Sequence, residues 1–170
     1  MSNDTLIDPN YVHALLVGVE RYDAGDHLSL RGPATDVARV ASWLVLRRVP
    51  EANIAVYLSK ADQESSFHGV GAVAMPRTPC GVASFGLPTA ANILNAFSRD
   101  ISRRGGDLLI VYWAGHGIIK ADQTRRLICS DSTDVELRSI ELSSALTFCR
   151  SSLVSGFGRQ IWIADASESK

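Results

Sequence analysis

The chain has 170 residues, 46% of them hydrophobic, which is enough for one domain with a substantial apolar core. Its 17 basic and 18 acidic residues are well mixed and give a formal net charge of −1, which argues against a nucleic-acid-binding surface. The N-terminus lacks a signal-peptide pattern and no apolar run is long enough to cross a bilayer, so we expect a cytoplasmic protein without membrane contact.

The first half of the chain predicts a strand, a helix and a second strand. Residues 11–19, YVHALLVGV, form an apolar, β-branched run typical of a buried parallel strand. Residues 32–49 have apolar side chains at three- and four-residue spacing, with Pro33 suited to a first helical turn. Residues 53–59 predict the next strand. Residues 60–87 hold four glycines and two prolines, which predicts a long loop.

The second half alternates helices and strands in the same way. The expected elements are a helix over 88–104, strands over 107–117 and 126–132, a helix over 140–152 and a strand over 159–167. In the helix over 88–104, we expect Ile93, Leu94, Phe97 and Ile101 to share one face.

The three cysteines are an odd number at wide spacings, which argues against a disulfide framework or a Cys-x-x-Cys metal site. Cys129 lies in an expected strand and Cys149 in an expected helix, so both should pack as small hydrophobic residues. Cys80 falls in the long loop.

Alternating strands and helices predict a three-layer α/β/α sandwich with a mainly parallel sheet, whose chemistry gathers at the carboxyl ends of the strands. Two of those ends carry reactive side chains. His116 stands between Gly115 and Gly117, and the last strand ends at Asp165-Ala166-Ser167. If the two strands are neighbours, His116 and Ser167 face each other across one crevice.

These segments resemble the caspase-like cysteine peptidases, in particular the metacaspase and prokaryotic caspase branch. The resemblance rests on HALLVGVERY, LSLRGPATDVARVASWL, the run from Pro88 through the Gly-His-Gly strand, LICSDSTDVELRSIELSSAL and IWIADAS. It implies that residues 1–170 form one caspase-like peptidase domain, corresponding to the large-subunit portion, which cleaves a protein or peptide substrate.

The resemblance implies a mechanism of acyl transfer. His116 would hold the proton of a nucleophile at position 167, and the N–H groups of Gly117 and of position 167 would form the oxyanion hole. Members of the family carry cysteine where this chain has Ser167, and a hydroxyl is a far weaker nucleophile without a well-aligned base. We therefore expect little or no peptide hydrolysis by the chain as written.

The resemblance also implies a substrate pocket. Asp36 and Asp165 match acidic pocket positions of the metacaspases and favour cleavage after arginine or lysine. A family serine two residues before the histidine is Ala114 here, which removes one polar contact. The rival is Arg31, because animal caspases use an arginine near this position to bind a substrate aspartate. Asp36 also has a simpler interpretation, as an acidic residue that stabilises the first turn of its helix.

Ser167 leaves two interpretations open: an engineered exchange of the nucleophilic cysteine for serine in an active peptidase, or a natural pseudoprotease that acts as a peptide- or protein-binding scaffold. A nucleotide-binding domain is a third hypothesis. It is weakened because the chain has no Gly-x-Gly-x-x-Gly after its first strand and no phosphate-binding Gly-x-x-x-x-Gly-Lys loop.

No cofactor is expected, and His13, His27 and His68 have no second ligand at metal spacing. Some metacaspases require calcium, and Asp131 and Asp134 are the candidates, although two carboxylates fall short of the 6 to 8 oxygens of a calcium site. In the resembling family the fold continues past the nucleophile. We therefore expect a small-subunit portion on the same protein or a second chain, a regulatory sensor module, and a role in immunity or programmed cell death.

Overall fold

The computed structural model describes residues 7–60, 84–154 and 156–168. They form a seven-stranded sheet in the order β3-β2-β1-β4-β5-β6, with β7 paired to β4 as well. The strands are β1 (Val12–Val19), β2 (Ile54–Ser59), β3 (Ser84–Gly86), β4 (Gly106–Ile119), β5 (Arg125–Ile128), β6 (Ser139–Glu141) and β7 (Phe157–Glu168).

The sheet is mixed, so the expectation of a mainly parallel sheet is met only in part. Pairs β1–β2, β1–β4, β2–β3 and β4–β7 are parallel, whereas β4–β5 and β5–β6 are antiparallel. The link between β4 and β5 spans only residues 120–124, too few for a crossover, so β5 returns beside β4 as a hairpin. β3 was not predicted; it lies at the end of the segment expected to be a loop, most of which falls outside the described residues.

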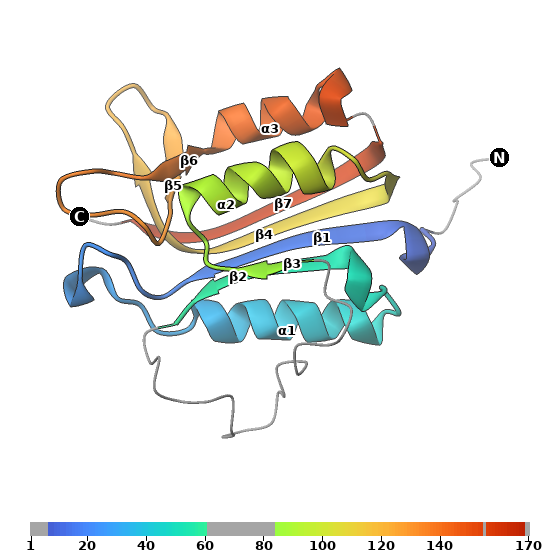
Figure 1. The fold of residues 1–170 in the computed structure, drawn as a ribbon, viewed down its shortest axis with the longest axis horizontal. Coiled ribbons are helices and arrows are strands. Elements are labelled where there is room, and N and C mark those ends of the chain that lie inside the picture. Colours follow the sequence, from blue (N-terminus) through green and yellow to red (C-terminus); the bar gives the residue numbers. More distant parts are fainter. Residues whose placement is uncertain (1–6, 61–83, 155, 169–170) are drawn as a thin grey trace.

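The helices cover both faces of this sheet, as expected. They are α1 (Pro33–Leu46), α2 (Ala90–Asn95), which continues into the π-helical η4 (Ala96–Ile101), and α3 (Leu142–Arg150). Figure 1 shows α1 on one side of the sheet and α2 and α3 on the other. Four 3-10 turns complete the described chain: η1 (Pro9–Tyr11), η2 (Asp26–Leu28), η3 (Glu51–Asn53) and η5 (Ser152–Val154).

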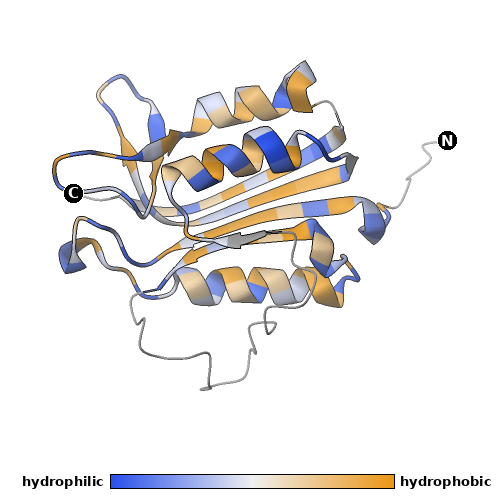
Figure 2. Cartoon of the chain, viewed as in Figure 1, coloured by the Kyte–Doolittle hydropathy of each residue, from blue (hydrophilic) through white to orange (hydrophobic). Residues whose placement is uncertain are grey.

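Each face of the sheet has its own apolar core, and the central strands are mostly hydrophobic (Figure 2). On the α1 side, Val37, Ala41 and Leu44 pack on the even-numbered residues of β4 from Leu108 to Ala114. On the other side, Ile93, Phe97 and Ile101 are buried. Leu94 is 56% exposed, so its expected place on the same face is wrong: positions 93, 97 and 101 already complete the i, i+4 stripe.

The N-terminus of α1 lies close to the sheet because β1 has a glycine beneath it. A Cβ on Gly18 would lie 2.9 Å from the carbonyl oxygen of Pro33 and 3.0 Å from Val37 Cγ2. The carboxylate of Glu20 then caps the helix, since its Oε1 accepts the N–H groups of Gly32 at 3.1 Å and Ala34 at 3.0 Å. These contacts fix the first turn of α1 beside the carboxyl ends of β1 and β4.

Candidate active site

The two reactive strand tips lie side by side. β4 and β7 pair in parallel along most of their length, with Ala114 opposite Asp165 and His116 opposite Ser167 in the register. The carboxyl ends of both strands therefore meet at one edge of the molecule, near the loop between β1 and α1 (Figure 1). This adjacency is the geometric condition that the sequence left open.

His116 is held at both its backbone and its ring. Its backbone N–H donates to the Tyr22 hydroxyl at 2.8 Å, and its Nε2 lies 3.0 Å from the carbonyl oxygen of Leu28. A carbonyl only accepts hydrogen bonds, so Nε2 carries the proton and the neutral ring keeps a lone pair on Nδ1. Nδ1 is buried and has no hydrogen-bond partner among the described residues.

The loop that carries Leu28 is bound to a second loop. Asp23 N–H donates to Ser130 O and Ala24 N–H to Ser132 O, both at 2.8 Å, and His27 Nε2 lies 3.2 Å from Asp134 Oδ1. These contacts tie the loop after β1 to the loop after β5. Leu28 could not be predicted from the sequence, because a backbone carbonyl leaves no signature in residue type.

The glycines on either side of His116 are required by close packing. A Cβ on Gly117 would lie 2.9 Å from Ala166 Cβ, so a side chain there would push β4 and β7 apart. A Cβ on Gly115 would lie 3.0 Å from the Tyr22 hydroxyl oxygen. The Gly-His-Gly pattern thus lets the neighbouring strand and a tyrosine approach the histidine closely.

Comparison with known proteins agrees with this architecture. The profile of the caspase domain, peptidase family C14, matches residues 12–170. The chain belongs to the caspase domain family. No curated protein sequence matches the chain significantly.

Two carboxylates of this caspase domain act on one buried tyrosine. Tyr112 is 7% exposed and belongs to the core under α1. Burial raises the pKa of its hydroxyl, and the negative charges of Asp36 and Asp165 raise that pKa further. Asp165 is exposed on β7, two positions along the strand from Ile163, the register partner of Tyr112. Asp36 and Asp165, far apart in the sequence, therefore share one neighbourhood.

Asp36 also has a partner on its own helix. Its Oδ1 lies 3.2 Å from Arg39 Nη1, three residues further along α1. Both side chains are solvent-accessible, at 37% for Asp36 and 67% for Arg39. An exposed pair of this kind contributes little free energy.

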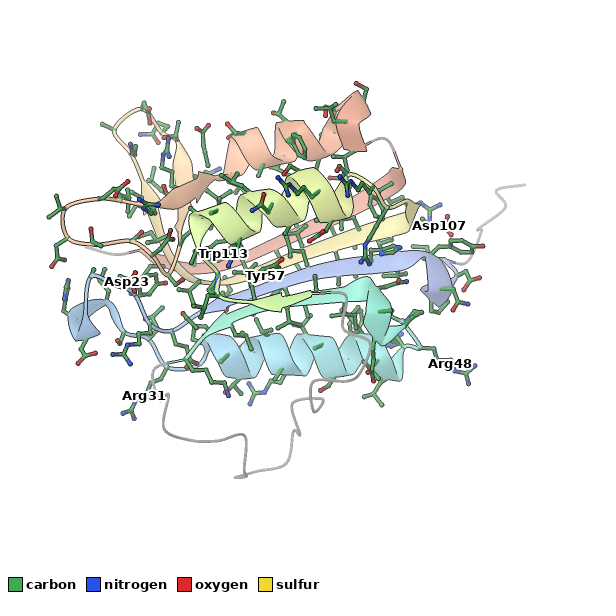
Figure 3. All side chains as sticks on the ribbon, viewed as in Figure 1. Asp23, Arg31, Arg48, Tyr57, Asp107 and Trp113 are labelled. Atoms are coloured by element: carbon green, nitrogen blue, oxygen red, sulfur yellow. The ribbon has the colours of Figure 1, made fainter. Side chains whose placement is uncertain are left out.

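The other two expected pocket residues differ in exposure: Ala114, although it is the register partner of Asp165, is buried, and Arg31 is exposed. Ala114 is only 2% exposed, because it belongs to the core beneath α1. Arg31 is exposed on the loop that enters α1, and Figure 3 shows its side chain directed away from the sheet. In the described structure, Ala114 offers almost no surface to a ligand and Arg31 points to solvent.

The described residues do not supply a calcium site at Asp131 and Asp134. Asp131 Oδ1 accepts the Ala90 N–H at 2.9 Å, and its Oδ2 lies 3.7 Å from Arg138. Asp134 pairs with His27. No group of three acidic, histidine or cysteine side chains able to hold a metal occurs within the described ranges.

The cysteines of the described chain are structural. Burial raises the pKa of Cys129 to about 12 and that of Cys149 to about 11, and both are fully packed, as predicted. Cys80 lies outside the described residues.

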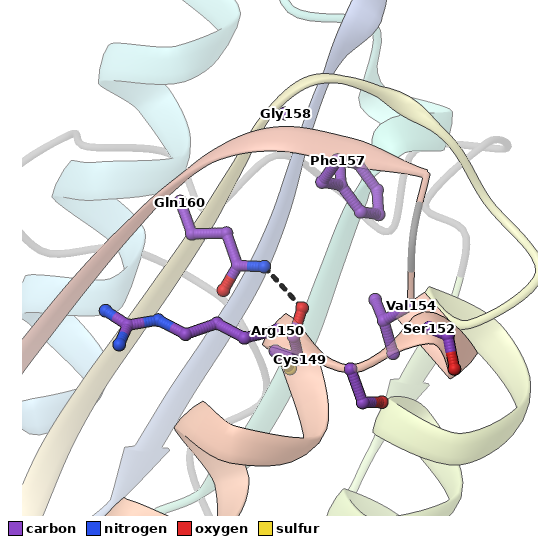
Figure 4. Close-up of a pocket in the computed structure, with 8 residues that line it drawn as sticks. Cys149, Arg150, Ser152, Val154, Phe157, Gly158 and Gln160 are labelled. Atoms are coloured by element: carbon purple, nitrogen blue, oxygen red, sulfur yellow. Dashed lines mark hydrogen bonds between the residues drawn. The ribbon is translucent and has the colours of Figure 1, made fainter.

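A hollow of about 410 Å³ lies beside Cys149, at the start of β7. Figure 4 shows the Gln160 amide reaching the Cys149 carbonyl there, a hydrogen bond of 2.5 Å. Gln160 and His116 lie toward opposite ends of the β4–β7 pair, so this hollow is separate from the candidate active site. No helix in the described part of the chain is long and apolar enough to cross a membrane.

Proposed function

We propose that this caspase domain is built for endopeptidase chemistry by His116 and a nucleophile at position 167, with cleavage after arginine or lysine. The observation that carries the proposal is the register of β4 and β7, which sets His116 opposite position 167 at adjacent strand ends. It is supported by the Nε2 contact to Leu28, which leaves Nδ1 of the neutral ring as a proton acceptor.

The proposed reaction is an acyl transfer. Nδ1 of His116 takes the proton of the nucleophile, which attacks the scissile carbonyl, and the imidazolium then returns a proton to the leaving amine. Backbone N–H groups at Gly117 and position 167 stabilise the oxyanion. Water attacks the acyl-enzyme and completes hydrolysis. A thiol at position 167 ionises readily near neutral pH, whereas the Ser167 hydroxyl does not, so we expect the Ser167 chain to be very slow.

The proposed preference for a basic substrate residue rests on Asp36 and Asp165. Both carboxylates are accessible and raise the pKa of the same Tyr112 hydroxyl, so a guanidinium or ammonium group near that tyrosine would be attracted by both negative charges and could form charge-assisted hydrogen bonds with them. An aspartate side chain would instead meet like charge.

A panel of fluorogenic peptides tests the proposal on the Ser167→Cys chain. We expect cleavage after arginine and lysine, none after aspartate, and loss of all cleavage with His116→Ala. Asp165→Asn should lower kcat/KM for the arginine peptide by roughly 10- to 100-fold, the equivalent of one charged hydrogen bond. Asp107→Asn is the matched control, since Asp107 is exposed at the opposite end of β4 (Figure 3). Preferential cleavage after aspartate would reverse the assignment.

Ser167 itself favours a second function. If the Ser167→Cys chain stays inactive while the Ser167 chain binds basic peptides, the domain is a pseudoprotease that uses the same crevice as a binding scaffold. Isothermal calorimetry with arginine-containing peptides, repeated on Asp36→Asn, measures that binding directly.

We also propose that a further polypeptide, either the small-subunit portion or a second chain, covers β7. Among the described residues β7 pairs with β4 alone, and Ile161 and Ile163 are each 47% exposed. An open edge with exposed apolar side chains is a surface that proteins normally cover. We expect hydrogen exchange to be fast at the outward-facing β7 amides of this chain alone. Protection at low protein concentration would contradict this proposal.

A further inference from the structure

The hydroxyl of Tyr22 binds the backbone of His116 where the pairing of β1 with β4 ends. The last β1–β4 pair in the register is Gly18 with Ala114, so the N–H of His116 lies beyond the end of β1. The Tyr22 hydroxyl accepts that N–H at 2.8 Å, and it donates to the carbonyl of Val19, the last residue of β1, over a longer 3.4 Å. The Tyr22 hydroxyl thus connects β1 and β4 by hydrogen bonds just beyond the last residue pair of the two strands.

Tyr22 also contacts the imidazole. The two ring centroids are 5.3 Å apart at an angle of 42°, and Tyr22 is only 2% exposed. The backbone and ring of His116 are therefore both in contact with Tyr22, while Nε2 meets Leu28. Each contact restricts a different rotation of the histidine.

The neighbouring glycine is consistent with this arrangement. A Cβ at position 115 would lie 3.0 Å from the Tyr22 hydroxyl oxygen and 3.2 Å from Val19 Cβ. Glycine therefore leaves room for the hydroxyl between the ends of β1 and β4. Burial raises the pKa of Tyr22, so the hydroxyl stays protonated and acts as a neutral hydrogen-bonding group.

We propose that Tyr22 is a positioning residue for His116: its hydroxyl fixes the histidine backbone so that Nε2 stays on the Leu28 carbonyl and Nδ1 stays free to accept a proton. This inference rests on the proposed function, because positioning affects catalysis only if His116 is the base. The arrangement of the imidazole itself can be measured without any reaction.

The kinetic test compares Tyr22→Phe with Tyr11→Phe, both in the Ser167→Cys chain. Tyr11 is a matched control because it is 55% exposed and precedes the other end of β1. We expect Tyr22→Phe to lower kcat about 5- to 10-fold, the kinetic equivalent of one neutral hydrogen bond, and to leave KM within about 2-fold. Tyr11→Phe should change neither. An unchanged kcat in a folded Tyr22→Phe protein would overturn the proposal.

Two measurements on the Ser167 chain do not depend on activity. Nitrogen-15 NMR should show His116 mainly as the Nε2–H tautomer, with a smaller share of that tautomer in Tyr22→Phe. Hydrogen exchange should show a protected His116 amide in the unchanged protein; an unprotected amide would overturn the proposal even if Tyr22→Phe does not fold. If Ser167→Cys is inactive but these two results hold, the proposed function fails and the positioning by Tyr22 stands.

Discussion

Replacing Gly18 with alanine tests how the structure places the acidic residue of α1. Gly18 lies in β1 beneath the first turn of that helix, and the added methyl group would lie 2.8 Å from Leu58 Cδ2, 2.9 Å from the Pro33 carbonyl oxygen and 3.0 Å from Val37 Cγ2. Real Cβ atoms almost never approach other heavy atoms this closely. The Leu58 side chain can rotate away, but the Pro33 carbonyl is backbone, so the start of α1 must move outward.

The cost follows from overpacking a closed core. Inserting a methyl group into a well-packed interior typically costs about 1–3 kcal/mol, and a domain of this size loses roughly 2–4 °C of melting temperature for each kcal/mol. We therefore expect Gly18→Ala to lower the free energy of unfolding in urea by about 1–3 kcal/mol. Because α1 carries Asp36 in its first turn, binding or cleavage of arginine peptides should weaken as well.

Gly158→Ala provides the control within the same sheet. Gly158 lies in β7, and a Cβ there would meet no atom within 4 Å. Glycine to alanine in open space gains about 0.4–1 kcal/mol by restricting the unfolded chain, so this variant should be as stable as the parent or more so. If the free energy of unfolding of Gly18→Ala lies within about 0.5 kcal/mol of the parent's value, contact with the sheet does not set the position of α1.

Two further predictions concern titratable groups. Burial, reinforced by the charge of Arg104, lowers the pKa of His13 below its usual 6.5. The unfolded chain then binds this proton more readily than the folded chain, so the free energy of unfolding should fall as the pH drops below about 6.5; urea titrations across that range check this, and His13→Gln should flatten the dependence. In a Cys80→Ser variant, iodoacetamide should label neither Cys129 nor Cys149 until the protein is denatured, because both thiols are buried and their pKa values are raised. Intact mass counts the labels, and rapid labelling of the folded protein would show that the core opens.

The sequence predicted most of the regular structure because hydrophobic periodicity acts locally. The buried run of β1 and the amphipathic stripe of α1 are both visible in residue type. The short strands β3 and β6, of three residues each, were missed. Three residues carry too little periodicity to predict a strand, and such strands form only because a neighbouring edge offers hydrogen bonds.

Some features of the candidate site could likewise be predicted from the sequence, and others could not. The Gly-His-Gly and Asp-Ala-Ser patterns at two strand ends pointed to His116 and position 167, but nothing in the sequence could show that β4 and β7 are neighbours. Ala114 shows what the sequence could not predict: its position matches a substrate-binding serine of the family, and in the structure it is almost completely buried in the core beneath α1. Burial depends on which element covers a strand, and local sequence does not encode that.

The amino-acid sequence by itself determined the alternation of strands and helices, the two strand ends that carry His116 and Ser167, and the absence of the cysteine thiol at position 167. Only the tertiary structure decided that those ends adjoin and that the charges of Asp36 and Asp165 both raise the pKa of Tyr112. It also decided that Tyr22 and Leu28 contact the histidine. The physical reason is distance along the chain. Side-chain chemistry and periodicity are properties of a few consecutive residues. These contacts instead join segments dozens of residues apart, and several of them use backbone groups, which every residue carries.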